Sequence, residues 1–299
     1  MNNLVPCQMI QRDFGLVFVP SLNPPPPAFI TVQHCGFGKE IFQGLFQERK
    51  SATPTDLKTF PLAMDIFRAA SPYVAVIYNQ FNRHYIETNV HPAEAYCDKR
   101  LAQYYDSFHR EIDDRIAESF AFNGPCVLLD LHGFGNQPEY APPGGYDAIL
   151  GTGNRSTVQI TDRARRNGKN NLDYRLREGL ESNGLSVFCP ESEPIREKMW
   201  RERASKDCPN KQIVPRNLIG EEEYESDSNF LQPPEIPDHL NGGYLIRKHT
   251  ENSDRVAAAI QIELVYPVRD RDESKNEGEI NKRMVFVHTV AALIKEISA

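Results

Sequence analysis

The stretch Cys126-Val-Leu-Leu-Asp-Leu-His132 is the clearest buried β-strand in the sequence, and it follows the helix-ending tripeptide Asn123-Gly-Pro. Further β-prone runs occupy residues 28–34, 73–78 and 185–188. Residues 257–265 are predicted to form a core strand, or a helix that continues into a strand. Apolar residues at helical spacing occupy residues 92–122, 173–182 and 284–297. Strands that alternate with helices predict an α/β fold, in which a mostly parallel mixed sheet carries helices on both faces.

The chain has 299 residues, of which 40% are hydrophobic and 25% charged, and this is ordinary for a globular protein. We expect a single domain over residues 1–299 rather than a string of small ones. The segment 196–237 differs from the rest, because it holds several prolines and the acidic run Glu221-Glu-Glu-Tyr-Glu225. We interpret it as a long surface excursion with a solvated acidic face.

Overall charge and composition exclude several classes of protein. A formal net charge of −7 argues against a nucleic-acid partner, which would normally meet a basic face. No stretch approaches the roughly 20 apolar residues that a membrane helix needs, and the first residues show no signal-peptide pattern. The six cysteines are scattered without a CxxC pair, so we expect reduced thiols, a cytoplasmic location and no cysteine zinc site.

Two histidines end apolar strands and are followed closely by glycine, in His34-Cys-Gly36 and His132-Gly-Phe-Gly135. Because ligands of open parallel sheets bind at the carboxyl ends of the strands, both imidazoles are candidates for one site. Asp130 precedes His132 by two residues, so both side chains point to the same side of the strand, where Asp130 could orient the site. The alternative is that these are two unrelated strand-end histidines.

A hydrolytic zinc ion needs about three protein ligands and one open position for water. Two imidazoles and one carboxylate satisfy this requirement. The candidate carboxylates between the histidines are Glu40, Asp56 and Asp65, and spacing alone does not choose among them.

Two further side chains could carry chemistry beside such a metal ion. Glu263 lies in an apolar strand-like run with Gln261, where a carboxylate is costly unless it has a partner, so it is a candidate general base. Its alternative role is a buried ion pair. Arg83 follows the second apolar run and offers a planar fork for a carboxylate or an oxyanion, although a lone arginine there could equally be a surface residue.

Seven segments occur along the chain in one order: His34-Cys-Gly, Thr55-Asp-Leu-Lys-Thr59, Arg83-His-Tyr-Ile-Glu-Thr-Asn89, Leu128-Leu-Asp-Leu-His-Gly133, Gly151-Thr, Gly242-Gly-Tyr244 and Ile260-Gln-Ile-Glu263. In this order they resemble the N-formylglutamate amidohydrolase family, over about residues 28–269 and more thinly across 196–237. The resemblance implies a fold like that of zinc carboxypeptidases and aspartoacylases (phosphorylase/hydrolase-like).

The resemblance also implies roles for individual residues. It implies a Zn²⁺ ion held by His34, Asp56 and His132, with Glu263 as general base and then acid and Arg83 in the active site. The family pattern further implies a substrate-binding group, which consists of Asn89, Thr152, Gly243 and Tyr244.

The sequence departs from the family pattern in one segment. Glu87 replaces the family's aspartate, and Val90 stands where a second arginine is usual, which puts N-formylglutamate itself in doubt as the substrate. We therefore expect a zinc-dependent amidohydrolase that cleaves the amide bond of a small N-acyl amino acid or peptide, N-formyl compounds included. The alternatives are a non-catalytic relative that binds metal or a small ligand, and a thiol hydrolase that uses Cys35 beside His34.

Overall fold

The computed structural model describes residues 6–21, 24–36, 43–49, 56–135, 141, 144–153, 156–158, 171–189, 242–250, 253–270 and 277–298. The excursion predicted at 196–237 and the candidate ligand Glu40 lie outside these residues. The single domain over 1–299 therefore stays a prediction.

Eight strands form one mixed sheet in the order β1-β2-β4-β3-β5-β8-β6-β7. Their bounds are β1 Cys7–Arg12, β2 Gly15–Pro20, β3 Ala28–Val32, β4 Val74–Asn79, β5 Cys126–Gly133, β6 Ala148–Gly151, β7 Val187–Phe188 and β8 Val256–Leu264. The four central strands β4, β3, β5 and β8 run parallel to one another. The hairpin β1–β2 adds antiparallel to β4, and the parallel pair β6–β7 adds antiparallel to β8. The predicted mixed α/β sheet is confirmed, and its parallel part is the centre.

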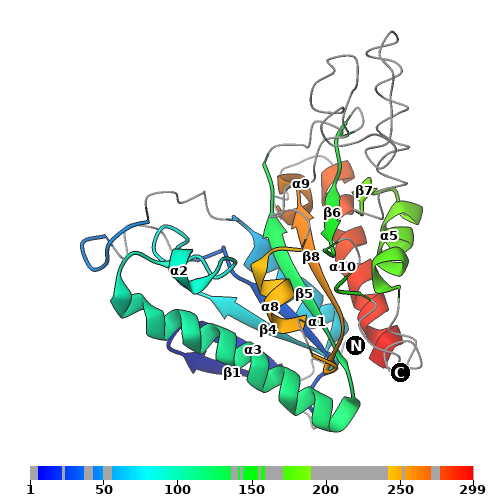
Figure 1. The fold of residues 1–299 in the computed structure, drawn as a ribbon. Helices are drawn as coiled ribbons and strands as arrows, with labels where there is room; N and C mark the ends of the chain where they lie inside the picture. The colour runs from blue at the N-terminus through cyan, green and yellow to red at the C-terminus, as the bar shows by residue number, and fades with distance from the viewer. Residues whose placement is uncertain are drawn as a thin grey trace, which may run out of the picture.

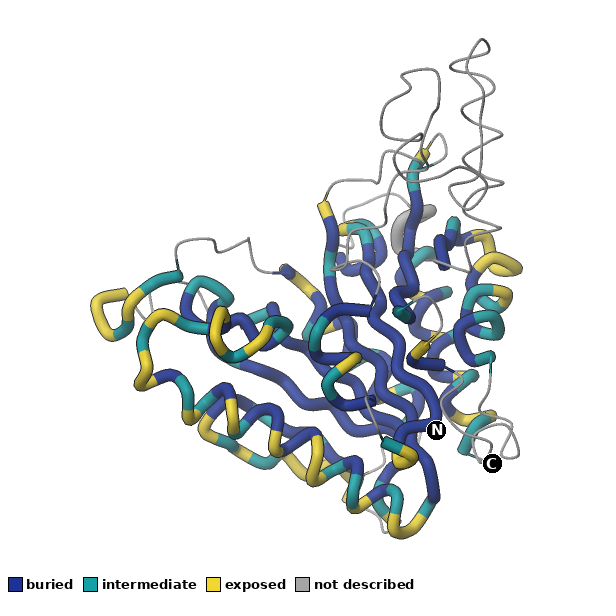
Figure 2. The backbone as a smooth tube through the Cα atoms, in the orientation of Figure 1, coloured by how far each residue is buried: buried dark blue, intermediate teal, exposed yellow. Residues whose placement is uncertain are grey.

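Helices cover both faces of this sheet (Figure 1). They are α1 Thr59–Ala70, α2 Pro92–Ala95, η2 Lys99–Leu101, α3 Ala102–Asn123, α5 Leu172–Ser182, α8 Tyr244–Thr250, α9 Tyr266–Arg269 and α10 Glu277–Ser298. Leu129 faces a core shared with α1, α5 and α10, whereas Leu128 faces a core shared with α3 and α8. Successive residues of a strand point to opposite faces, so a strand between two helical layers is apolar throughout. Figure 2 shows the central strands buried along their length.

The helix predicted over residues 92–122 is broken into three pieces. His91 accepts a hydrogen bond from the backbone of Ala93 and begins α2, while Tyr96 is extended and ends it. The carboxylate of Asp98 then accepts from the backbone of Arg100, and so begins the turn that leads into α3. Each polar cap satisfies backbone N–H groups that a continuous helix would bond internally, which explains the break.

Other boundaries differ in smaller ways. The run at 257–265 is the strand β8, not a helix, and the strand predicted at 185–188 contains only two paired residues. The closing helix predicted at 284–297 begins earlier, at Glu277. The hairpin β1–β2, the strand β6 and the helix α1 have no counterpart in the sequence-based prediction. In the described part of the chain, no helix is both long enough and apolar enough to cross a membrane.

Strand register places polar side chains side by side at one edge of the sheet. In the parallel ladders, Asp130 pairs with Thr31 on β3 and with Gln261 on β8. Two residues nearer the carboxyl ends of β5 and β8, His132 pairs with Glu263. The general-base candidate therefore lies directly across from a candidate metal ligand.

We expect Leu129→Ala to lower the free energy of unfolding by about 2–5 kcal/mol, because it opens a cavity between the sheet and its helices. Leu129 is only 2% exposed. The matched control is Leu45→Ala, at a side chain that is 58% exposed; it should change stability by no more than about 0.5 kcal/mol. Denaturant unfolding followed by circular dichroism measures both, and equal effects would contradict the assigned core.

Candidate metal centre

The chain leaves β3 through Gln33 and His34 and then passes close to the backbone of Phe81. A side chain at Gly36 would place its Cβ 2.1 Å from the carbonyl oxygen of Phe81, so this close approach requires glycine. The backbone N–H of Asp56 donates to the carbonyl of His34 at 2.8 Å. The loop before α1 is thereby fastened to the end of β3, and Asp56 is brought beside His34.

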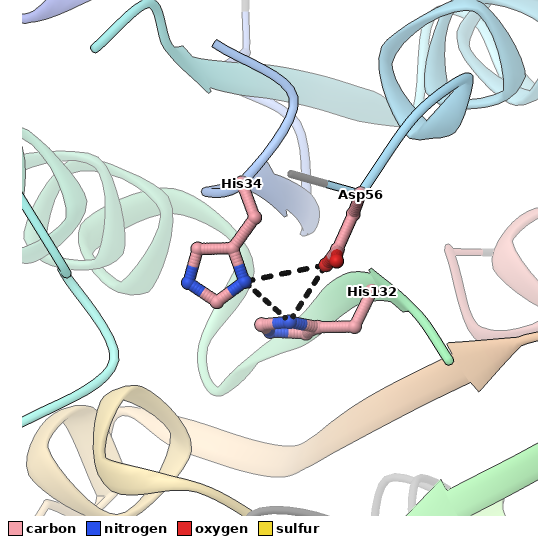
Figure 3. Close-up of side chains that lie close together, drawn as sticks. All are labelled: His34, Asp56 and His132. Atoms are coloured by element: carbon pink, nitrogen blue, oxygen red, sulfur yellow. Dashed lines mark hydrogen bonds and ion pairs between the residues drawn. The ribbon is translucent and has the colours of Figure 1, made fainter. Parts of the chain in front are cut away.

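His34, Asp56 and His132 converge on one point and could hold a metal ion (Figure 3). Nδ1 of His34 lies 3.2 Å from Oδ2 of Asp56 and 3.1 Å from Nδ1 of His132. Nδ1 of His132 lies 3.4 Å from the same oxygen of Asp56. Ligand atoms of one tetrahedral zinc ion lie roughly 3.3 Å apart, as metal–ligand distances of about 2.0–2.1 Å require. The three ligand atoms therefore have the spacing of one face of such a tetrahedron.

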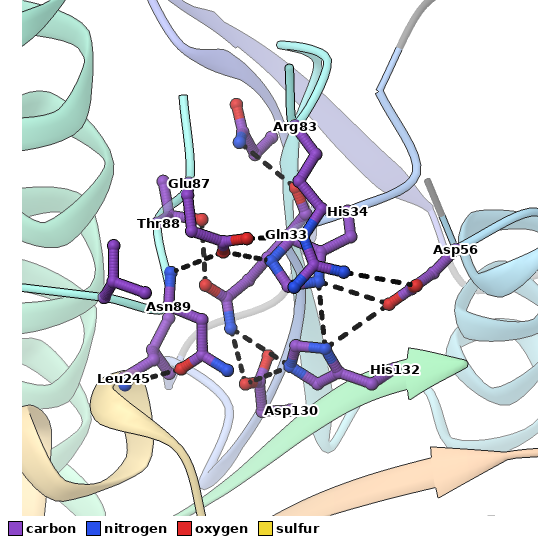
Figure 4. A network of polar contacts seen from close by, with 12 residues as sticks. Gln33, His34, Asp56, Arg83, Glu87, Thr88, Asn89, Asp130, His132 and Leu245 are labelled. Carbon is purple, nitrogen blue, oxygen red and sulfur yellow. Dashed lines mark hydrogen bonds and ion pairs between the residues drawn. The ribbon is translucent and has the colours of Figure 1, made fainter. Parts of the chain in front are cut away.

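A carboxylate holds the outer nitrogen of each imidazole (Figure 4). Nε2 of His34 lies 2.5 Å from Oε1 of Glu87, and Nε2 of His132 lies 2.7 Å from Oδ2 of Asp130. A carboxylate accepts the Nε2 proton, which leaves the Nδ1 lone pair directed at the shared point. Metal-ligating histidines commonly have this carboxylate–histidine arrangement.

Asp130 is fully buried and accepts hydrogen bonds from the neighbouring strand β3 and from the residue just after it. The hydroxyl of Thr31 donates to Oδ1 at 2.6 Å, and the amide of Gln33 donates to Oδ2 at 2.5 Å. Gln33 in turn accepts from the hydroxyl of Thr88 at 2.8 Å. These contacts stabilise a charge that would otherwise be costly to bury, and they place Asp130 beside His132 as its position in the strand predicts.

Glu87 is a member of the site, although by sequence it is only a departure from the family pattern. Its carboxylate accepts from Nε of Arg83 and from the backbone of Asn89, and a guanidinium nitrogen of Arg49 lies 3.8 Å away. Glu87 is 2% exposed. An acidic residue in the segment Arg83-His-Tyr-Ile-Glu87 could have indicated the contact with His34. The two residues are far apart along the chain, so the sequence alone does not pair them.

Burial and charge oppose each other at the carboxylates. Burial alone raises the pKa of Asp56, but hydrogen bonds from His132 and His34 outweigh it and hold that pKa well below its usual range. At Glu87 the charges of His34 and Arg83 likewise overcome burial and lower the pKa. At His132 burial lowers the pKa, yet the charges of Asp130 and Glu263 raise it well above its ordinary value. The cluster therefore attracts positive charge.

Glu263 lies across from His132 and is buried, with an exposed fraction of 5%. The amide of Gln261 donates to its Oε1 at 2.6 Å. Burial raises the pKa of Glu263, whereas the charge of His132 lowers it. A raised pKa is the direction that favours a carboxyl group which takes up and then releases a proton.

Arg83 lies beside the three candidate ligands and remains accessible. Its side chain is 21% exposed, and besides the contact with Glu87 its NH1 lies 3.9 Å from Oδ1 of Asp56. The structure thus places Arg83 beside Asp56 and Glu87, and its catalytic role stays a prediction.

The four predicted substrate-binding residues have structural contacts. Asn89 accepts a hydrogen bond from the backbone of Leu245 at 2.8 Å and so caps the start of α8. A Cβ at Gly243 would lie 2.5 Å from the amide nitrogen of Asn89, so the turn before α8 passes close to that side chain. The ring of Tyr244 lies 6.0 Å from that of His91, and Thr152 is buried with its carbonyl bonded to Thr157. Binding of substrate by these four residues stays a prediction.

The other candidates of the sequence analysis lie elsewhere or are engaged otherwise. Asp65 bonds to Arg68 and Arg283 at 2.7 Å each, and it is not part of the group around the two histidines. Both ring nitrogens of His34 contact groups other than the Cys35 thiol, which argues against a Cys–His pair. Val90 packs against an apolar cluster that includes Phe81 and Tyr105.

We expect purified protein to bind close to one divalent ion per chain, and His132→Ala and Asp56→Asn to bind far less, because each loses one of three ligands. Elemental analysis after dialysis against zinc measures this. The matched controls are His91→Ala and Asp98→Asn, which remove the same groups at helix caps. Equal metal content in all four variants would contradict the assignment.

Comparisons with known proteins show which family and which solved structures this chain resembles. The model of the N-formylglutamate amidohydrolase family matches residues 51–191. The crystal structure of N-formylglutamate amidohydrolase from Ralstonia eutropha JMP134 has a TM-score of 0.55 and 15% sequence identity, covering 94% of this chain and 97% of that one. That of a gene product from Agrobacterium tumefaciens has a TM-score of 0.51 and 15% identity, covering 91% and 90%.

At this identity the two structures show a common fold. A comparison with the sequences of curated proteins found no significant match. The segment matched by the family contains Asp56, Arg83, Glu87 and His132. The predicted resemblance of this chain to the N-formylglutamate amidohydrolase family is confirmed over residues 51–191, which contain four of the seven short segments.

Proposed function

We propose that this chain is a zinc-dependent amidohydrolase that cleaves a small N-acyl amino acid or peptide with a water molecule. The observation that carries the proposal is the convergence of His34, Asp56 and His132 with the spacing of metal ligands. The family match supports amide hydrolysis as the reaction. We propose a cytoplasmic location with it, because the six cysteines are scattered along the sequence without a CxxC pair.

The chemistry of the donors fits zinc. Two imidazole nitrogens and one carboxylate oxygen are a common ligand set for catalytic zinc, which keeps a further position open. Four carboxylates surround the two histidines, from Asp56, Glu87, Asp130 and Glu263, so a dication would offset their charge. A zinc ion bound there would make a water molecule more acidic and polarise the amide carbonyl.

Glu263 would move the protons of the reaction. As the water oxygen bonds to the amide carbonyl carbon, the carboxylate takes the proton that this oxygen releases. When the C–N bond breaks, the same carboxyl group gives that proton to the amine nitrogen, so the products are a carboxylic acid and an amine. Gln261 holds one oxygen of Glu263, which leaves the other for this exchange.

Arg83 would stabilise the negative charge that develops on the carbonyl oxygen. Glu87 accepts from Nε of Arg83 and therefore fixes the plane of the guanidinium group, whose NH1 is directed toward the Asp56 side of the site. A cation held in place before the reaction needs little rearrangement when charge develops. Oxyanion stabilisation is therefore the role we assign to Arg83.

Val90 argues against glutamate as the amino-acid part of the substrate. Valine there packs with aromatic side chains instead of offering a second charge. A screen of N-formyl and N-acetyl amino acids with acidic, neutral and aromatic side chains tests the reaction and its specificity. If a zinc-loaded protein hydrolyses none of them, the non-catalytic alternative gains support.

Glu263→Gln should retain zinc and lose turnover by at least about a hundredfold, the usual contribution of a positioned general acid–base group. The amide keeps the shape of the side chain but cannot take a proton. Zinc content and kcat on the best substrate of the screen are the measurements. The control is Glu118→Gln, at an exposed glutamate on α3. Retained turnover, or loss of zinc, would show that Glu263 has a different role.

Arg83→Lys should lower kcat by about tenfold to a hundredfold with little change in KM, because lysine keeps the charge but loses the planar fork. Steady-state kinetics separate the possible roles. A higher KM with unchanged kcat would assign Arg83 to a substrate carboxylate instead. Wild-type values of both constants would remove it from the site. Arg12→Lys, at a partly exposed ion pair with Glu111, is the control.

A further inference from the structure

Two buried arginines connect the C-terminal helix to the loop that carries Asp56. Arg269, at the end of α9, is 6% exposed, and Arg283, on α10, is 3% exposed. NH1 of Arg269 donates to the carbonyl of Leu57 at 2.6 Å. Arg283 donates to the carbonyl of Arg269 through NH1 and to Oδ2 of Asp65 through NH2, the latter at 2.7 Å. A continuous set of hydrogen bonds thus runs from α10 and α1 to the residue after Asp56.

Arg269 also touches the strand that carries the second histidine. An ideal Cβ built on Gly133 would lie 2.2 Å from NH1 and 2.3 Å from Cζ of Arg269. The guanidinium group therefore lies directly against the backbone of Gly133, the residue after His132. Glycine at this position makes room for the arginine. One side chain thus contacts the neighbours of two candidate metal ligands.

The short loop from Asp56 to Lys58 depends on hydrogen bonds for its shape. The backbone N–H of Asp56 donates to His34, and the carbonyl of Asp56 accepts from the hydroxyl of Thr59 at 2.8 Å. The Leu57 side chain is 57% exposed and packs little, while Lys58 has a left-handed backbone with φ of 70°. The bond from Arg269 to the Leu57 carbonyl is therefore a main constraint on the part of the loop that follows the ligand.

The charge of Arg269 acts in the same region. Burial lowers the pKa of its guanidinium group, while the charges of Asp56 and Glu263 raise it. The arginine thus lies within electrostatic reach of a candidate ligand and of the proposed general base. Arg83 contacts the site beside Glu87, and Arg269 approaches it beside Gly133.

We propose that Arg269 is a positioning residue of the metal centre, which holds the Leu57 carbonyl and thereby keeps Asp56 in the position of a ligand, while Arg283 keeps Arg269 in place. This inference rests on the metal site of the proposed function. It assigns Arg269 no contact with substrate. Its consequence is that metal affinity depends on a side chain that binds no metal.

The experiment measures zinc affinity by competition with a chromophoric chelator, with the thermal unfolding of the zinc-free protein recorded for each variant. Arg269→Met should weaken zinc binding by about tenfold, the lower end of the range for residues that orient metal ligands. Arg269→Lys, which can still donate to Leu57, should recover part of the loss. The matched control is Arg68→Met, which removes an exposed arginine from the same Asp65 that Arg283 contacts; its zinc affinity should stay within about twofold of wild type.

Gly133→Ala gives a second test in a chain that keeps every charge. Its methyl group would displace the Arg269 guanidinium, so zinc affinity should again fall. If Gly133→Ala acts through Arg269, adding it to Arg269→Met should cause little further loss, because contacting residues are not additive. A Gly133→Ala variant that folds and binds zinc like wild type would overturn the proposal, even if Arg269→Met fails to fold.

The possible results separate the two proposals. If wild-type protein binds no zinc, or if His132→Ala binds it equally well, the proposed metal site is wrong and the role of Arg269 falls with it. If wild-type binding depends on His132 but Arg269→Met has unchanged affinity, the metal site stands and the positioning role is wrong. Unchanged affinity with a lower unfolding temperature of the zinc-free protein would show that Arg269 only stabilises the fold.

Discussion

The parallel register of β3, β5 and β8 determines where the polar side chains of the candidate metal centre lie. In this register Thr31, Asp130 and Gln261 form one row across the sheet, and His132 and Glu263 form the next. A shift of one residue would turn each of these side chains to the opposite face, into the core under α1 and α10. The same apolar residues that fill the two cores therefore also keep the site assembled.

Several carboxylates can be buried together at the carboxyl ends of the central strands because each has a hydrogen-bond or ion-pair partner. Asp130 accepts from Thr31, Gln33 and His132, and Glu87 is shared by an imidazole and two guanidinium groups. An unpaired buried carboxylate would instead become protonated or destabilise the fold. The positions of the carboxylates are thus fixed by hydrogen bonds, and the two histidines are held with their Nδ1 atoms toward Asp56.

The sequence predicts those features of this molecule that depend on residues close together in the chain. The core strands and the strand-end histidines follow from apolar runs that stop at glycine, and the pairing of Asp130 with His132 follows from the two-residue repeat of a strand. Asp56 could not be chosen over Asp65 from spacing, because the choice depends on how the loop before α1 folds back on His34. Glu87 and Arg269 were missed for the same reason: each contacts the site through residues far away in the chain. The hairpin β1–β2 was missed as well; β1 is largely exposed and shows little apolar pattern.

The segment from Arg83 to Val90 shows how a lost charge can be supplied from elsewhere in the fold. By sequence, valine at position 90 leaves Arg83 as the main cation of this segment. In the structure Arg49 donates to the carbonyls of Arg83 and Glu94, and its guanidinium group lies 3.8 Å from Glu87. Burial lowers the pKa of Arg49, and the charge of Glu87 raises it. Two guanidinium groups therefore share one carboxylate, so Glu87 only partly neutralises Arg83. In the proposed function, this residual positive charge would serve the developing oxyanion without an arginine at position 90.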